Sequence, residues 1–275
     1  MASAPRKLPP PDPETRGRRN GAGGEWLLGL ILPLVILLAW EYLASHHLIN
    51  DRLMPEPSRV WTMLVKLTAT GDLLFHIVAT LRRVALGFLF GTAAATALGA
   101  LTGYSTLARR VLDPTLQALR AIPSIAWVPL FILWFGIFET SKVILIAVGV
   151  FFPIYLALSD AIPAVDRKLV EVARVYRLSP ARMTVRVLLP ATLPAYLTAL
   201  RSGLGLGWMF VVAAELMGAS EGLGYLLVDG QETGNPTQII AAIAVFAIVG
   251  KLTDWGLALL SARLLVWQDA FKTAA

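Results

Sequence analysis

Long apolar runs separated by short polar segments occupy most of the chain. We expect six membrane-spanning helices from these runs, at about 26–44, 77–103, 122–138, 143–160, 191–217 and 237–260. Each run falls near the roughly 17–25 residues that a helix needs to cross the hydrocarbon of a bilayer. The pattern therefore predicts an all-α polytopic membrane protein whose transmembrane domain covers residues 26–265.

A strongly basic segment, 166–190, lies between two of the most apolar runs. Its cationic side chains are Arg167, Lys168, Arg174, Arg177, Arg182 and Arg186. An unpaired charge in hydrocarbon costs roughly 2.5–3.5 kcal/mol on insertion scales, so this segment must lie outside the membrane. We interpret it as a loop exposed to water on one side of the bilayer.

The basic segment contains the signals of two short helices. Asp166 is a candidate N-cap for a first helix over 167–177. Ser179, followed by a proline, is a candidate N-cap for a second helix over 180–189. We expect Pro190 to end that second helix or to kink the chain.

The two ends of the chain carry polar tails. Residues 1–25 are rich in proline, glycine and charge, which predicts a disordered cytoplasmic tail. The first apolar run is long for a signal peptide and no small-residue cleavage site follows it, so we expect an uncleaved span. Residues 266–275 are expected to form a second cytoplasmic tail.

The distribution of basic residues predicts the orientation. With both termini in the cytoplasm, the inner side collects five basic residues in the N-terminal tail, two at 109–110 and six in 166–190. The outer side has fewer basic residues: Arg52, Arg59, Lys66 and Lys142, and none in the loop 218–236, so the positive-inside rule supports this orientation. Arg82 and Arg83 do not fit, and we expect them to snorkel or to face the bundle interior.

Several positions within the spans suggest close packing or a solute path. Gly87, Gly91, Gly99 and Gly103 form two small-xxx-small pairs, which favour close helix packing. Pro123 interrupts its span, and the backbone groups that it frees are tolerated only against protein or water. Arg120 and Pro123 are therefore candidate lining residues of a pathway.

Two charges lie within the fifth span. Arg201 and Glu215 are fourteen residues apart, which is roughly 21 Å along a helix, so they cannot pair with each other. Both are candidate pathway residues. Arg201 either steers an anion or pairs with Asp160 or a carbonyl, and we favour the pairing.

Composition narrows the classes of function. Hydrophobic residues make up 56% of the chain and charged residues 15%, against about 25% charged in soluble proteins. There is no cysteine and there are only three histidines, so we expect no disulfide and no metal site. The net charge of +6 fits basic loops that face anionic lipid, and we expect no nucleic-acid binding.

Sequence motifs of catalysis are missing. The chain has no GxxxxGK[ST] phosphate loop, no GxSxG and no HExxH, and GLGLG at 203–207 lacks the dinucleotide-binding spacing. We expect no catalytic residue and no cofactor. Two classes of function stay open on the charged residues: an ion-coupled transporter that uses Glu215 and Asp254, and an intramembrane enzyme that uses Glu215 or His76.

The basic segment carries a recognisable signature. Glu171-Val172-Ala173 is followed by three residues, Arg177, nine residues, Val187, one residue and Leu189-Pro190. This spacing resembles the EAA loop of binding-protein-dependent ABC importer permeases, with Val172 in place of an alanine and Arg177 in place of a glycine. The segments LDPTLQALRAIPSIAWVPLFILWFGI, SKVILIAVGVFFPIYLALSD, LTALRSGLGLGW and AAELMGASEGLGYLL resemble the nitrate, sulfonate and taurine type of permease.

The resemblance implies a MetI-like core, multi-pass in the bacterial inner membrane, whose loop 166–190 forms coupling helices for a cytoplasmic ATPase. The implied loop residues are Glu171, Val172, Ala173, Arg174, Arg177, Ser179, Val187, Leu189 and Pro190. The implied partners are two ATPase subunits, an extracytoplasmic solute-binding protein, a second permease copy and membrane lipid. The implied solute is a small anion such as an aliphatic sulfonate, taurine or nitrate.

Arg177 occupies the position of the family's glycine, where a positive φ favours glycine. An arginine in that conformation would be strained by roughly 1–2 kcal/mol. We therefore expect either that the first helix ends differently, for example one residue later, or that Arg177 contacts the partner.

Overall fold

The computed structural model describes residues 25–50 and 53–266. These residues form two units, which divide after Trp61. The first unit contains α1 (Glu25–Ser45) and the start of α2 (Pro57–Ala69). Apart from their innermost residues, the expected cytoplasmic tails 1–25 and 266–275 lie outside the described residues.

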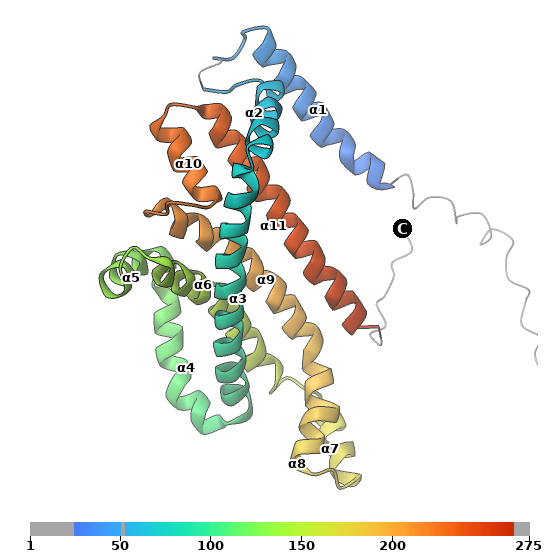
Figure 1. Cartoon of the computed structure of the whole chain (residues 1–275). Coiled ribbons are helices and arrows are strands. Elements are labelled where there is room, and N and C mark those ends of the chain that lie inside the picture. The colour runs from blue at the N-terminus through green and yellow to red at the C-terminus, as the bar shows by residue number, and fades with distance from the viewer. Residues whose placement is uncertain (1–24, 51–52, 267–275) are drawn as a thin grey trace, which may run out of the picture. The chain divides into compact units, whose positions relative to one another are not determined.

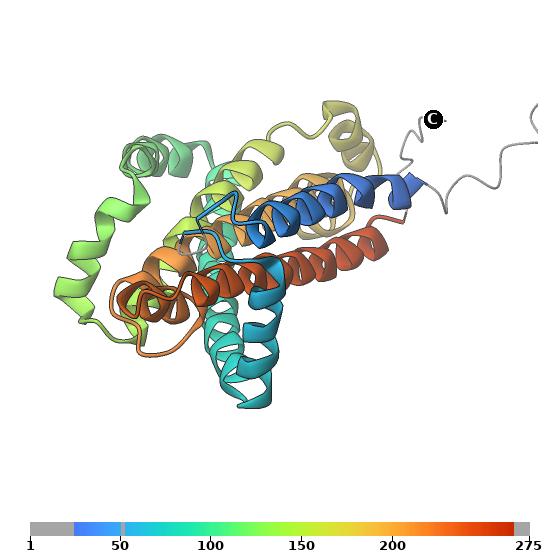
Figure 2. The ribbon, with the colours of Figure 1, turned by 90° about the horizontal axis from the view of Figure 1, so that it is seen from above.

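Three long helices form the centre of the second unit: α3 (Asp72–Tyr104), α6 (Glu139–Ala161) and α9 (Leu189–Leu216). α6 packs along both α3 and α9, and Figures 1 and 2 show the three helices grouped together. Their shared core is aliphatic, because Ile146, Val150 and Ile154 of α6 are fully buried against neighbours on both sides. This core fixes the relative positions of the charged side chains described below.

Glycines let α3 and α6 approach closely. A Cβ added at Gly87 would lie 2.6 Å from the Cβ of Ile146, and one at Gly91 would lie 2.5 Å from the carbonyl oxygen of Ala147. Real Cβ atoms do not come so near, so only glycine permits this helix separation. The predicted close packing through these glycines is confirmed.

The segment between α3 and α6 is bent. It consists of α4 (Thr106–Ala121), the 3-10 turn η2 (Ser124–Trp127) and α5 (Val128–Phe135), with an 87° bend. The expected interruption of this segment at Pro123 is present: eight-residue α5 is only about 12 Å long and counts as a candidate span only together with α4, so the expected span 122–138 stays a prediction. Ile122 has an extended backbone (φ −76°, ψ 122°) because it precedes Pro123, and the chain changes direction there.

The remaining helices complete the unit. α11 (Pro236–Leu264) packs against α9 and against the shorter α10 (Leu223–Glu232). Helix α10 lies within the segment 218–236, which was expected to be a loop. Its apolar residues Leu223 and Leu226 are buried and pack in one cluster with Ala242 of α11, so tertiary contacts stabilise this ten-residue helix.

Four helices are long and apolar enough to cross a membrane: Asp72–Tyr104, Glu139–Ala161, Thr184–Leu216 and Pro236–Leu264. The bent α4–α5 pair would raise the number of candidate spans to five. The described apolar part of α1, Ile31–Ser45, is shorter. Six spans and cytoplasmic termini therefore stay predictions, whereas the all-helical architecture predicted from the apolar runs holds for the described residues.

Candidate functional site

The first coupling-loop helix begins as predicted. α7 (Arg167–Val175) starts after Asp166, whose side chain accepts a hydrogen bond of 2.9 Å from the backbone N–H of Lys168. This bond satisfies one of the N–H groups that the first helical turn leaves without a partner. Asp166 is therefore the N-cap.

The end of α7 keeps the backbone geometry of a glycine although Arg177 stands there. Arg177 has φ +50°, its N–H donates to the Arg174 carbonyl (2.9 Å), and the Leu178 N–H donates to the Ala173 carbonyl (3.1 Å). These two bonds are the Schellman motif, in which the residue after the helix is left-handed. The expectation that the helix would end differently, one residue later, is wrong: α7 stops at Val175.

The second part of the loop is continuous with a span. α8 (Pro180–Met183) follows Ser179 and leads into a π-helical turn, η3 (Thr184–Leu188), and then directly into α9. Pro190 does not stop the second helix, because the chain stays helical from Thr184 to Leu216, and the predicted alternative, a kink at Pro190, stays a prediction. The π-helical turn η3 is wider than an α-helical turn. It accommodates Pro190, because proline lacks an N–H and its ring crowds the carbonyl four residues earlier.

An open apolar groove lies between α7 and the η3–α9 junction. It is lined by Leu169, Val172, Ala173, Tyr176, Leu178, Arg186, Val187, Pro190 and Ala191. On α7, Val172 is half exposed and Ala173 is buried, and Tyr176, directly after the helix, is 77% exposed. We call this surface the coupling groove.

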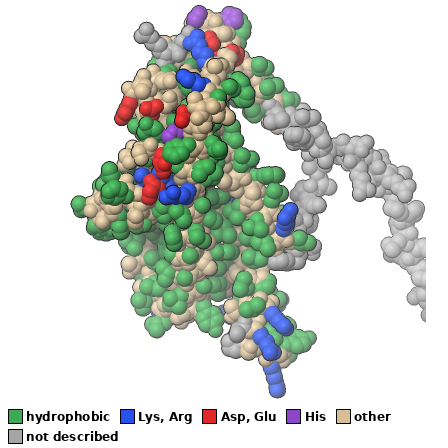
Figure 3. All heavy atoms as spheres, viewed as in Figure 1, with side chains coloured by type: hydrophobic (Ala, Val, Ile, Leu, Met, Phe, Trp, Pro, Cys, Tyr) green, Lys and Arg blue, Asp and Glu red, His purple; other side chains and the backbone are tan. Residues whose placement is uncertain are grey.

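Cationic side chains flank the coupling groove. Arg167, Lys168, Arg174, Arg177, Arg182 and Arg186 are all exposed, and Figure 3 shows lysine and arginine gathered at this end of the view. Glu171 is exposed on the same helix. The structure thus brings the predicted loop residues onto one surface that is apolar in the middle and basic around it.

The guanidinium of Arg83 is buried in the N-terminal half of α3, away from the end that leads into α4. Arg83 is 1% exposed, and its Nε and Nη2 donate to the two carboxylate oxygens of Glu139, both at 2.7 Å. Nη1 donates to Glu215 (2.7 Å) and to the Glu221 carbonyl oxygen (2.6 Å), and Nη2 also lies 3.3 Å from the Glu221 carboxylate. All five N–H groups of Arg83 can therefore be satisfied.

Glu215 is the second buried charge of this cluster. It is fully buried and accepts hydrogen bonds from Thr80 Oγ1 (2.8 Å) and from the Gly224 N–H (2.7 Å). Thr80 in turn accepts a bond from the Leu223 N–H (2.8 Å). As a result, Glu215 ties the start of α10 to α3 and α9, and it does not face an open path.

The backbone before α10 fits tightly against the same cluster. The Gly222 N–H donates to His76 Nδ1 at 3.0 Å. Gly222 has φ +114°, and a Cβ there would lie 2.6 Å from Arg83 Nη1, so only glycine fits. We call Thr80, Arg83, Glu139, Glu215 and Glu221 the polar cluster.

Of the two arginines that did not fit the positive-inside count, Arg83 faces the interior as expected and Arg82 is exposed. The partners of Arg83 were not predicted from the sequence. The sequence showed only that Arg83 is an arginine inside a long apolar run, and such a residue usually faces the interior of the helix bundle.

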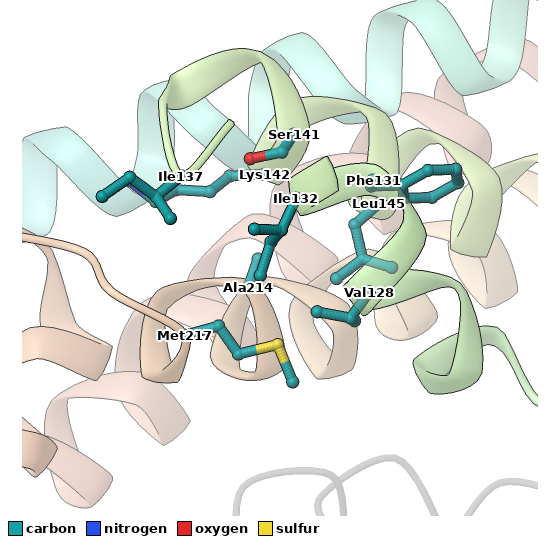
Figure 4. A pocket seen from close by; sticks show the side chains of 9 residues that line it. All are labelled: Val128, Phe131, Ile132, Ile137, Ser141, Lys142, Leu145, Ala214 and Met217. Carbon is teal, nitrogen blue, oxygen red and sulfur yellow. The ribbon is translucent and has the colours of Figure 1, made fainter. Parts of the chain in front are cut away.

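The bent α4–α5 segment contributes a small apolar pocket beside the polar cluster (Figure 4). Its lining comes from α5, α6, the turn between them, and the end of α9 with the residue that follows it: Val128, Phe131, Ile132, Ile137, Ser141, Lys142, Leu145, Ala214 and Met217. Lys142 Nζ donates to Glu139 at 3.1 Å, so the pocket and the cluster share a wall. Arg120 and Pro123 lie exposed on the other side of the bend, outside this pocket.

Arg201 has a different partner from those expected. Its Nε and Nη2 donate to the two carboxylate oxygens of Asp254 on α11, at 3.0 and 3.1 Å. Asp160, the expected partner, instead accepts a bond of 2.7 Å from Arg109. Arg201 and Glu215 are thus paired separately, as their spacing on one helix required.

Comparison with known proteins agrees with these features. Residues 73–266 match the family model described as "Binding-protein-dependent transport system inner membrane component". The putative aliphatic sulfonates transport permease protein SsuC of Bacillus subtilis is 40% identical over 90% of each chain. The taurine transport system permease protein TauC of Escherichia coli is 34% identical over 85% of this chain and 87% of its own length.

A solved structure shares the fold. A chain of the inward-facing MetNI methionine ABC transporter superposes with a TM-score of 0.62 at 20% identity, over 72% of this chain and 98% of that one. The predicted MetI-like fold is confirmed. From its matched length, its apolar helices and its relatives, the chain is a multi-pass protein of the inner membrane and belongs to the family of binding-protein-dependent transport system inner membrane components.

Proposed function

We propose that this chain provides the translocation pathway of an ABC importer for a small anion, such as an aliphatic sulfonate, taurine or nitrate. The chain itself is a permease subunit and not an enzyme, and a separate partner hydrolyses ATP. The named solutes come from the relatives of this chain.

The observation that carries the proposal is the coupling groove. An exposed apolar surface with basic side chains around it is suited to bind a protein partner in water, since burying Val172 and Tyr176 would favour association. The cations would steer and orient an acidic rim on that partner. We propose two cytoplasmic ATPase subunits as the partners, one for each permease copy.

The connection from the groove into the membrane supports a mechanical role. η3 runs without a break into α9, so a displacement of the groove would be passed on to a 28-residue helix. Rigid-body movement of such helices is the expected mode of alternating access. An extracytoplasmic binding protein would deliver the solute from the other side, and a second copy would complete the pathway.

The test is uptake by proteoliposomes that contain the chain with its ATPase and binding protein. We expect ATP-dependent uptake of taurine, nitrate or an alkanesulfonate. Tyr176→Ala should weaken ATPase binding by about tenfold or more, because a large exposed aromatic contact is lost.

Leu107→Ala is the matched control, because Leu107 is 72% exposed at the start of α4, outside the coupling groove. Equal ATPase affinity of the two variants would contradict docking at the groove. Uptake that collapses with a proton ionophore and ignores loss of the ATPase would instead favour the ion-coupled alternative.

A further inference from the structure

Three charged side chains lie half-way along two membrane-spanning helices. Lys251 is the sixteenth of the 29 residues of α11, which places it about 20 Å from either end of the helix. Asp254 follows one turn later, and Arg201 lies near the middle of the span Thr184–Leu216. We call Arg201, Lys251 and Asp254 the mid-span triad.

In a single copy of the chain, the side chains of the mid-span triad are partly or largely exposed. The Lys251 side chain is 78% exposed, that of Arg201 46% and that of Asp254 31%. A charge at this depth costs roughly 2.5–3.5 kcal/mol on insertion scales if it faces lipid. The face of α9 and α11 that carries the triad is therefore expected to contact water or protein.

The mid-span triad has unused hydrogen-bond donors. Asp254 takes two bonds from Arg201 and lies 3.7 Å from the Lys251 ammonium, so two cations share one carboxylate and the net charge is +1. Among the described residues, Arg201 Nη1 has no partner and Lys251 has only Asp254. Guanidinium and ammonium groups with free N–H bonds are the usual ligands of oxyanions.

The polar cluster around Arg83 offers a useful contrast. There every guanidinium N–H has an acceptor, the arginine is 1% exposed, and three carboxylates surround it. Such a site has no donor left for a ligand and has an excess of negative charge nearby. Of these two intramembrane arginines, Arg201 is the one that can bind an anion.

We propose that the mid-span triad is the contact site for the anionic group of the transported solute, a sulfonate or a comparable oxyanion. Lys251 and Arg201 Nη1 hold the oxyanion, and Asp254 positions the Arg201 guanidinium. The site lies near the depth at which transporters commonly bind their solutes. This inference rests on the proposed function, since it assumes that the face lines the pathway.

The chain contains no cysteine, so a single cysteine can be introduced without background labelling. In proteoliposomes with the ATPase and binding protein, Lys251→Cys should reduce alkanesulfonate uptake about tenfold, the effect of losing one charge-assisted hydrogen bond. A trimethylammonium-ethyl methanethiosulfonate, which restores a positive charge, should recover uptake. The sulfonatoethyl reagent, which adds a negative charge, should not.

Leu252→Cys is the control: it is the next residue of α11, 57% exposed and apolar, and it should keep uptake and resist the charged reagents. Lys251→Arg should also keep uptake, which shows that charge and not assembly is at stake. The inference is overturned if Lys251→Cys transports normally or resists both reagents. If the wild-type complex shows no ATP-dependent uptake, the proposed function itself fails.

Discussion

Arg177 shows how a single residue can keep a conformation that its side chain disfavours. The Schellman bonds at the end of α7 need a left-handed residue, and Arg177 supplies it at φ +50°. The penalty for a non-glycine residue there is about 1–2 kcal/mol. The exposed guanidinium next to the coupling groove is the evident candidate for a compensating role, as a contact with the ATPase.

Arg177→Gly should therefore stabilise the chain and weaken its complex. We expect the free energy of unfolding to rise by about 1 kcal/mol, because relief of the left-handed strain exceeds the added freedom of the unfolded chain. Thermal unfolding and ATPase binding would be measured in parallel. Arg174→Gly, inside α7, should lose about 1 kcal/mol instead. Unchanged assembly and transport of Arg177→Gly would contradict the partner contact.

Arg83 illustrates the opposite case, a side chain that is wholly enclosed. Removing it would leave Glu215 buried without its countercharge, so Arg83→Met should destabilise the chain by about 3–5 kcal/mol. The double variant Arg83→Met/Glu215→Met should regain much of that loss. Arg82→Met, at the exposed neighbouring position, is the control. Equal unfolding midpoints for the two single arginine variants in detergent would disprove the role of the polar cluster.

At the scale of elements, the sequence predicts what local patterns determine. The apolar runs locate α3, α6, α9 and α11, and Asp166 marks the start of α7. The partners of Arg83 lie 56, 132 and 138 residues away, and no local pattern reveals such pairs. The pairing of Arg201 with another helix was likewise beyond local reasoning, because several acidic groups were available.

Elements that differ from the sequence expectations have both tertiary and local causes. α10 is short and is held by buried contacts with α11, and α5 is a separate helix because the bend at Pro123 redirects the chain. The π-helical turn before Pro190 replaces a break that proline alone would suggest. Packing therefore decided the outcome for α10, whereas the bend before α5 follows from the local geometry of a residue that precedes proline.

The α3–α6 contact gives a test at this scale. Gly91→Ala should destabilise the chain by about 1–3 kcal/mol, because its Cβ would lie 2.5 Å from the Ala147 carbonyl oxygen and push the helices apart. Gly256→Ala in α11, with nothing within 4 Å of the added atom, should instead stabilise slightly through helix propensity. The measurement is the free energy of unfolding of both variants in the same detergent. If both change stability alike, close packing through Gly91 is not important.

At the scale of the whole molecule, function requires that the coupling groove and the mid-span triad act together. α9 joins them, since it begins at the groove and carries Arg201. From Leu189 to Arg201 is about 18 Å along the helix. Pro190 and Pro194 lie in this stretch, yet the helix is continuous from Leu189 to Leu216, so the groove and Arg201 are joined by one helix.

Softening that connection should separate binding from transport. Replacing Leu188 and Leu189 together by glycine should lower the stability of the helix at the η3–α9 junction by about 1 kcal/mol per position. We expect the ATPase to dock almost normally while ATP-dependent uptake falls about tenfold, because the push at the groove is absorbed before it reaches the triad. The matched control places the same two glycines at Gln117 and Ala118 of α4, which are exposed and away from this route. If the junction variant transports like this control, α9 is not the element that connects the ATPase to the solute, and the movement must pass through another helix.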